Sequence, residues 1–325
     1  MRKLIILVAV IIFAGILYFF FLAAPQGSAL TGQAETERFV VPLNANRSQA
    51  IQSLSDEGFI KSSLGFNIAL MLRGKLGTIA PGGYKISKNQ NAFQIAGVLA
   101  GEPYMKWLII PEGERKEQIA NTLAQTLDWD NQTRNEFLNY YSSIGPDYKE
   151  GVYFPDTYLL PKDETGSQIA KRFIDKFNEK FQPYAGQFSK QNIKWTTAVK
   201  IASLVEREAA NEGDMPLIAG IIWNRLLQGM PLAIDATIQY AKGGADDDYW
   251  TPLVKGDTKM DSLYNTYLHK GLPPTPISNP GLPAILAVLN PAKTNCLYYL
   301  HDNQGIIHCA VKYAEHQKNI DKYLK

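Results

Sequence analysis

The first feature of the hydrophobic pattern is an uninterrupted apolar run near the start of the chain. Residues 4–24 carry no charged side chain, and Met1-Arg2-Lys3 precede them. A helix of this length spans about 30 Å, which matches the hydrocarbon core of a bilayer. The positive-inside rule then predicts a transmembrane helix at 4–24, with a cytoplasmic tail at 1–3 and the rest of the chain exported. The alternative is a cleaved signal peptide, although its apolar region normally has only about 7–15 residues.

Short elements of alternating type follow the apolar run. Residues 25–36 are rich in small and polar side chains and are expected to form a flexible linker. Beyond the linker, the pattern predicts a strand, two helices and a second strand, at 38–42, 49–56, 62–73 and 80–86. This order is similar to that of a LysM-type carbohydrate-binding module, so we expect residues 37–105 to form such a module.

The longer remainder of the chain, residues 106–325, is dominated by helical periodicity. Helices are predicted at 116–127, 135–142, 168–184, from Trp195 past Glu206, and at 216–228, 282–289 and 314–324. A strand is predicted at 107–111 and a hairpin at 297–308. Residues 242–282 show little periodicity, and such a long loop in a compact domain is usually functional. The predicted fold class is therefore α+β, with a transmembrane helix, a βααβ LysM-like module and a second, mixed α/β domain.

Composition limits the class of function. With 46% hydrophobic and 20% charged residues, the 325-residue chain is globular and long enough for two domains. A net charge of +2 gives no indication of nucleic-acid binding. The four histidines lack a tight ligand spacing and there is no Cys-x-x-Cys motif, so neither a metal nor another cofactor is expected.

The two cysteines, Cys296 and Cys309, flank a hairpin signal at Asp302-Asn303-Gln304-Gly305. A turn centred on Asp302-Asn303 would bring the two thiols to opposite positions of the hairpin. In an oxidising exterior this arrangement permits a cross-strand disulfide. The alternative is a pair of inert, half-buried thiols, because a register slip of one residue would separate the sulfur atoms.

The acidic residue that stands out is Glu206, in a helical segment of good helix formers. Small residues occupy the turns before and after it, namely Ala202, Ser203, Ala209 and Ala210. Glu208 follows two residues later and therefore points about 200° away around the helix. A carboxyl among small, apolar neighbours is open to desolvation, which raises its pKa toward the range of a general acid. The alternative is an ordinary solvated Glu-Arg-Glu face.

Several motifs occur in an order that resembles the MltG (YceG-like) family of membrane-anchored endolytic murein transglycosylases. The resemblance covers nearly the whole chain, and the ordered set is far more specific than any single block. The blocks are Ile110-Pro111-Glu112-Gly113, Glu150-Gly151-x-x-Phe154-Pro155-Asp156-Thr157-Tyr158, Ala202-Ser203-Leu204-Val205-Glu206-Arg207-Glu208, Asn224-Arg225-Leu226-x-x-Gly229-Met230-x-Leu232, Asp235-Ala236-Thr237-x-x-Tyr240, Tyr264-Asn265-Thr266-Tyr267, Gly271-Leu272-Pro273-Pro274-x-Pro276-Ile277-x-Asn279-Pro280-Gly281 and Leu289-Asn290-Pro291-Ala292-Lys293-Thr294.

The resemblance implies that residues 106–325 form a catalytic transglycosylase domain with Glu206 as its acid and base. The implied reaction is non-hydrolytic cleavage of the β-1,4 bond between N-acetylmuramic acid and N-acetylglucosamine in nascent peptidoglycan. It leaves 1,6-anhydro ends and is expected to terminate strand elongation. One carboxyl is sufficient for this chemistry, whereas ordinary glycosidases use two. Asp235 is the candidate for a second carboxyl, and we expect it to fix a loop instead.

Four residues of the later blocks are candidates for substrate binding. Tyr264 offers a face for stacking on a sugar, and Asn265 offers an amide for an acetamido group. The alternative is that this segment only covers the core, with Asn265 closing a turn. Thr237 and Tyr240 belong to the block after Glu206 and are expected to bind substrate as well.

Another four residues are expected to support the site without contacting substrate. Glu208 lies in the same motif as Glu206, and Asp235 begins a later motif. Asn224 and Arg225 lie one to two turns into the predicted helix at 216–228. Arg225 is expected to pair with Glu208 or Asp235.

The resemblance also implies a location and partners. We expect a single-pass protein of the bacterial inner membrane, anchored through residues 4–24, with its catalytic domain in the periplasm. Its partners would be peptidoglycan glycan strands and, as candidates, the peptidoglycan synthases. Two other functions remain open: a glycan-binding scaffold of the elongation or division machinery, and a muramidase-type hydrolase.

Overall fold

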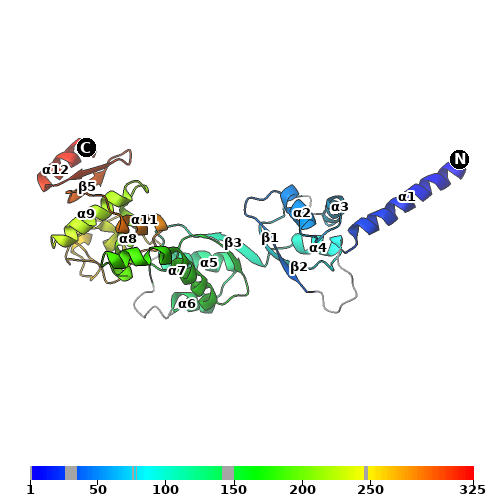
Figure 1. Cartoon of the computed structure of the whole chain (residues 1–325), viewed down its shortest axis with the longest axis horizontal. Coiled ribbons are helices and arrows are strands. Elements are labelled where there is room, and N and C mark those ends of the chain that lie inside the picture. The colour runs from blue at the N-terminus through cyan, green and yellow to red at the C-terminus, as the bar shows by residue number, and fades with distance from the viewer. Residues whose placement is uncertain (1, 26–34, 75–76, 78, 141–149, 245–247) are drawn as a thin grey trace. The chain divides into compact units, whose positions relative to one another are not determined.

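The computed structural model divides the chain into two compact units (Figure 1). Unit 1 comprises Met1–Leu108 and Tyr158–Glu164, and unit 2 comprises Ile109–Thr157 and Thr165–Lys325. The structure describes residues 2–25, 35–74, 77, 79–140, 150–244 and 248–325. The chain is a mixture of helices and strands, which confirms the predicted α+β class.

The N-terminal apolar run forms one long helix, α1 (Arg2–Ala23). Its segment Ile5–Ala23 has 19 residues and a mean hydropathy of 3.1, so by length and composition it is able to cross a membrane. The predicted linker at 25–36 lies largely outside the described residues, because only Pro25, Glu35 and Thr36 of it are described.

The strands of unit 1 belong to a four-stranded sheet. The strands lie in sequence order and are β1 (Glu37–Val41), β2 (Gly82–Ile86), β3 (Met105–Ile109) and β4 (Thr157–Pro161). β1 pairs with β2 in antiparallel fashion, with Phe39 opposite Tyr84. β4 was not predicted from the sequence. The strand has only five residues and ends in proline, which weakens its periodic signal.

Three helices cover the sheet and complete the core of unit 1. They are α2 (Arg47–Asp56), α3 (Ser63–Leu72) and α4 (Ala92–Leu99). The first two confirm the predicted helices, and Asn46 and Ser62 cap them by accepting hydrogen bonds from main-chain N–H groups. α4 was missed, although Asn91 gives it the same kind of cap. Its inward residues Ile95 and Ala96 are completely buried, so it is part of the core.

Unit 2 is built mainly from helices packed around α8 (Trp195–Glu208), which contacts α9, α10 and α11. The other helices are α5 (Lys116–Leu127), α6 (Asn131–Leu138), α7 (Gly166–Lys190), α9 (Met215–Leu227), α10 (Asp235–Lys242) and α11 (Leu282–Leu289). The long loop after α10 contains one short 3₁₀ turn, η2 (Asp257–Lys259). α6 begins four residues before the predicted start at 135, because Asp130 caps it through the N–H of Thr133. Residues 141–142 of that prediction lie outside the described residues.

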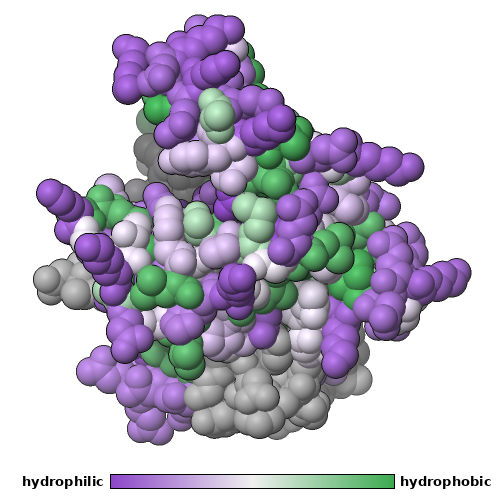
Figure 2. Space-filling model, turned by 90° about the vertical axis from the view of Figure 1, so that its left-hand side faces the viewer, coloured by the Kyte–Doolittle hydropathy of each residue, from purple (hydrophilic) through white to green (hydrophobic). Residues whose placement is uncertain are grey.

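The chain ends in a hairpin and a helix. These are β5 (Tyr298–His301), β6 (Ile307–Ala310) and α12 (Tyr313–Tyr323). A disulfide joins Cys296 to Cys309, which settles the alternative that the sequence left open. The register differs from the simple expectation, since Tyr299 lies opposite Cys309. α12 has no buried residue, and Figure 2 shows this segment, at the top of the view, as mainly hydrophilic.

Candidate active site

Glu206 lies in the last turn of α8, and the turns before it anchor the helix in the core. Ala202 and Val205 are completely buried, as is Ser203. The Ser203 hydroxyl donates to the carbonyl of Lys200 at 2.8 Å and accepts the N–H of Ile277 at 3.1 Å. The end of α8 is therefore fastened to the loop that carries residues 277–281.

The Glu206 side chain is half-buried, and its Oε2 accepts a hydrogen bond from the N–H of Gly281 at 3.0 Å. Burial raises the pKa of this carboxyl to about 7. The hydrogen bond from Gly281 opposes the rise, while the negative charge of Glu112 adds to it. Glu206 is therefore poised to exchange a proton near neutral pH.

The loop at 277–281 is held in place by Asn279, which is completely buried. Its main-chain N–H donates to the carbonyl of Glu114 at 2.8 Å, and its own carbonyl accepts the N–H of Gly113 at 2.9 Å. Its side chain accepts the N–H of Tyr153 at 2.8 Å and donates to Oε1 of Glu150 at 2.6 Å. One asparagine therefore joins the segments that contain three of the sequence motifs.

Glu150 is a buried carboxyl behind this loop, with 2% of its surface exposed. Besides the Asn279 amide, its Oε1 accepts the N–H of Lys116 at 3.0 Å. Burial raises the pKa of Glu150 to about 8, so it is mostly protonated at neutral pH. Because Glu150 is buried and bonded to Asn279, it supports the loop.

A second carboxyl, Glu112, lies on the exposed side of the same loop. A Cβ atom built on Gly281 would lie 1.8 Å from Oε1 of Glu112 and 2.9 Å from its Cγ. Since the N–H of Gly281 is bonded to Glu206, the two carboxyls meet at this glycine. Burial and the charge of Glu212 raise the pKa of Glu112. The sequence analysis matched the motif that contains Glu112 but assigned it no role.

Asp235, the expected candidate for a second carboxyl, lies elsewhere. It is the exposed first residue of α10, and the hydroxyl of Tyr267 donates to its Oδ1 at 2.6 Å. Its charge acts on Glu208, whose Oε2 accepts the hydroxyl of Tyr299. Burial is the largest cause that raises the pKa of Glu208. The structure thus places Asp235 with Glu208, and the neighbour of Glu206 is Glu112.

Asn224 and Arg225 connect α9 to the segment before the hairpin. The Asn224 amide donates to the carbonyls of Thr294 at 2.8 Å and Cys296 at 3.1 Å. The Arg225 guanidinium donates to the carbonyls of Leu297 at 2.6 Å and Leu232 at 2.5 Å. These main-chain bonds take the place of the expected pairing with an acidic side chain, although the charge of Arg225 still lowers the pKa of Glu208.

The four expected substrate-binding residues divide into two pairs. Asn265 and Thr237 are completely buried and bond to main-chain carbonyls: the Asn265 amide donates to Met260 at 2.8 Å, and the Thr237 hydroxyl donates to Ile234 at 2.6 Å. Tyr240 and Tyr264 are half-buried, with their rings 4.9 Å apart between centroids. Only the tyrosines of this set expose surface to a ligand.

A cationic and aromatic stack borders Glu206, and the sequence analysis did not identify it. The Arg207 guanidinium lies 3.9 Å from the ring centroid of Trp250. Arg115 lies 4.3 Å from the same ring and 4.6 Å from that of Tyr240. The arginines come from segments far from Trp250 in the sequence, so no local pattern signals their meeting. The stack places a positive charge next to the candidate acid.

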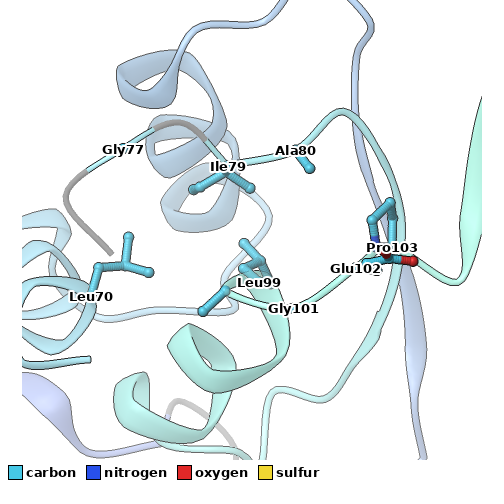
Figure 3. A pocket seen from close by; sticks show the side chains of 9 residues that line it. Leu70, Gly77, Ile79, Ala80, Leu99, Gly101, Glu102 and Pro103 are labelled. Atoms are coloured by element: carbon cyan, nitrogen blue, oxygen red, sulfur yellow. The ribbon is translucent and has the colours of Figure 1, made fainter. Parts of the chain in front are cut away.

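A different hollow, of about 430 Å³, lies in unit 1 (Figure 3). Leu70, Ile79 and Leu99 give it an aliphatic wall, and Glu102 is the titratable side chain among its described lining residues. Glu206 and Glu112 do not line this hollow. Within the described residues, no group of three or more His, Cys, Asp and Glu side chains is arranged to hold a metal ion.

Comparisons with known proteins show the family of the chain. The YceG-like family matches residues 39–322. The chain is 29% identical to the endolytic murein transglycosylase of Bacillus subtilis (strain 168) over 306 residues, which covers 87% of this chain and 84% of the relative. It is 27% identical to the endolytic murein transglycosylase of Streptococcus pneumoniae serotype 2 (strain D39 / NCTC 7466) over 335 residues, with coverage of 91% of this chain and 60% of that relative.

A solved structure is also similar. The crystal structure of a yceG-like protein from Listeria monocytogenes matches 87% of this chain and 98% of its own, with a TM-score of 0.62 and 25% sequence identity. The fold is thus shared along most of both chains. The family match covers far more than half of the sequence. This chain belongs to the YceG-like family.

Proposed function

We propose that this protein is an endolytic murein transglycosylase in which Glu206 is both the general acid and the general base. The observation that carries the proposal is the state of Glu206: half-buried, bonded to the N–H of Gly281, with a pKa raised to about 7. A general acid is most effective when its pKa lies near the working pH. The names of the relatives from Bacillus and Streptococcus support the substrate class.

The reaction uses one carboxyl in two protonation states. Protonated Glu206 donates its proton to the glycosidic oxygen while the bond from C1 to that oxygen breaks. The resulting carboxylate takes the proton of the 6-hydroxyl on the same muramic acid residue, whose oxygen forms the new bond to C1. The product is a 1,6-anhydro end, and Glu206 is protonated again. The N–H of Gly281 stabilises the carboxylate between the two transfers.

Glu112 is proposed as the partner that keeps Glu206 protonated before cleavage. Two nearby carboxyls disfavour ionisation of each other, and the charge of Glu112 raises the pKa of Glu206. A second carboxyl also revives the hydrolase alternative, since glycosidases use a pair about 5–9.5 Å apart. The products distinguish the two: a lyase leaves anhydro ends, and a hydrolase leaves reducing ends with one water added.

Substrate contacts are proposed for Tyr240, Tyr264 and the Trp250 stack, because these side chains expose aromatic surface or charge. Arg207 offers its charge to an anionic group of the substrate. Asn265 and Thr237 receive a different role: Asn265 holds the loop that carries Tyr264, and Thr237 joins that loop to α10, which carries Tyr240. Glu208, Asp235, Asn224 and Arg225 are proposed to support the site through their bonds to Tyr299, Tyr267 and the main chain.

The setting is proposed to be the outer face of the bacterial inner membrane. α1 would be the single span, and the cations Arg2 and Lys3 would keep the N-terminus in the cytoplasm. The disulfide between Cys296 and Cys309 supports an oxidising compartment for unit 2. The order β1-α2-α3-β2 supports a LysM-like module in unit 1. Peptidoglycan synthases are proposed as neighbours because nascent glycan strands are made at this membrane.

The deciding experiment is mass spectrometry of the muropeptides released from purified murein by the detergent-solubilised full chain. Glu206→Gln is compared with Glu136→Gln, the same substitution at a carboxyl of α6 that bonds to Gln132. We expect anhydro ends from the wild type and from Glu136→Gln, and none from Glu206→Gln. Reducing ends would establish a hydrolase. No products from any folded variant would favour the glycan-binding scaffold.

A further inference from the structure

α3 has an apolar face that points away from the core of unit 1. Its inward residues, such as Phe66 and Ala69, are completely buried. The outward side chains of Leu64, Met71 and Leu72 are 64%, 50% and 64% exposed. With the partly exposed Ile68 they stand at positions i, i+4, i+7 and i+8, which form one stripe along a helix. A helix that is apolar on both faces needs a second apolar medium.

The end of α1 packs directly on α3. A Cβ atom on Gly65 would lie 3.3 Å from Cβ of Leu22, so the glycine permits a close approach of the two helices. Ala23 is 3% exposed and belongs to the same core cluster as Phe66. Figure 1 shows α3 beside the inner end of α1. The point where α1 leaves the hydrocarbon is therefore within reach of α3.

The charged residues near the apolar stripe of α3 favour a lipid surface as the partner of that stripe. Lys61 precedes α3, is exposed, and lies 5.4 Å from the ring of Phe21 in the last turns of α1. Arg73 follows α3 and is also exposed. Cations at the ends of an apolar face suit the anionic headgroups of a bilayer, where helices of this kind lie in the interface plane.

We propose that Leu64, Ile68, Met71 and Leu72 of α3 enter the outer leaflet of the bilayer that α1 spans, so that unit 1 rests on the membrane surface. The proposal depends on α1 being a membrane span and is independent of the chemistry at Glu206. It assigns a lipid contact to a face that the transglycosylase reaction does not use. It also predicts that unit 1 is held at the membrane by two elements, α1 and α3.

The test places nitroxide labels on the full-length protein in liposomes of phosphatidylethanolamine and phosphatidylglycerol. Single-cysteine variants carry the label: Leu64→Cys and Met71→Cys on the stripe, Gln52→Cys as an exposed polar control on α2, and Ile12→Cys inside α1. Cys296 and Cys309 do not compete for the label because they form a disulfide. Collision rates with oxygen and with a water-soluble nickel chelate then report the depth of each label.

We expect a several-fold higher ratio of oxygen to nickel collisions at positions 64 and 71 than at 52, and a depth of about 5–10 Å below the headgroups. A ratio at both stripe positions equal to that at position 52 would overturn the proposal. So would a water-accessible label at position 12, since α1 would then not span the bilayer. Spin–spin broadening at position 64 that disappears on dilution with unlabelled chain would assign the stripe to a second copy instead.

Discussion

The main-chain N–H of Gly281 donates to Oε2 of Glu206 at 3.0 Å, and the side of its Cα that would carry a Cβ atom faces Glu112. A single glycine therefore separates the proposed catalytic carboxyl from its acidic neighbour. The arrangement gives the site a charge coupling that can be altered without touching Glu206.

Replacement of Glu112 by Gln should move the alkaline limb of the pH–rate profile to lower pH. The charge of Glu112 raises the pKa of Glu206, so its removal lowers that pKa and reduces the protonated fraction of the acid at neutral pH. Burial is the larger cause of the raised pKa, so the shift should be partial. The measurement is the rate of anhydro-end formation against pH. Glu136→Gln, on α6, is the control and should leave the profile unchanged, because its carboxyl bonds to Gln132 of the same helix.

Gly281→Ala should reproduce the effect of Glu112→Gln on the pH profile. The added Cβ would collide with the Glu112 carboxyl, but that carboxyl is the end of an exposed, flexible side chain that is able to turn away. The φ angle of Gly281 is −74°, which alanine accepts without strain. The melting temperature should therefore change little while the alkaline limb shifts. A collapse of thermal stability would show that the loop cannot yield at this point.

Glu150→Gln should reduce the pH dependence of stability. The pKa of this carboxyl is raised from 4.5 to about 8 in the fold, so between these values the folded chain holds a proton that the unfolded chain has released. Stability therefore falls as pH rises through this window. Gln keeps an oxygen acceptor and does not ionise. The unfolding free energy of the variant should therefore fall less than that of the wild type between acidic and alkaline pH. Urea titrations across this range provide the measurement.

A companion variant, Glu150→Ala, separates the charge from the hydrogen bonds. It leaves the N–H of Lys116 and the amide of Asn279 without their acceptor. A buried donor without a partner costs about 1–3 kcal/mol, so this variant should be less stable than Glu150→Gln at every pH. Equal stability of the two would mean that these bonds contribute nothing.

Ser203→Ala should destabilise the protein and reduce activity together. The Ser203 hydroxyl accepts the buried N–H of Ile277, and its loss leaves that donor unpaired, at a cost of about 1–3 kcal/mol. The loop at 277–281 then loses one of its attachments to α8. Ser189→Ala removes an exposed hydroxyl that bonds only within α7 and should cost much less. Denaturant unfolding and the rate of glycan cleavage are the two measurements.

The local pattern around Glu206 marked this residue as a candidate, because small neighbours at helical spacing are visible in the sequence. The role of acid and base came from the resemblance to the YceG-like family, since the pattern alone also fitted a solvated Glu-Arg-Glu face. Its partners were not visible. Glu112 and Glu150 come from loops that only tertiary contacts bring to α8, and Asn279 carries most of those contacts. α10 was not predicted. Its N-cap residue, Ile234, has no side-chain oxygen, so the usual signal for the start of a helix is missing. The sequence also could not separate Asn265 and Thr237, which face inward, from Tyr240 and Tyr264, because polarity alone does not determine burial.

The attachment of Asn279 to Glu114 joins residues 165 positions apart in the chain. Contacts of such sequence separation form late in folding, after most of the intervening chain is in place. During synthesis, a chain that has not yet been extended past Gly281 lacks the amide that holds Glu206 and the asparagine that joins the loops. We expect such a nascent chain to be inert toward glycan. The order of translation would then keep a half-made enzyme from cutting glycan.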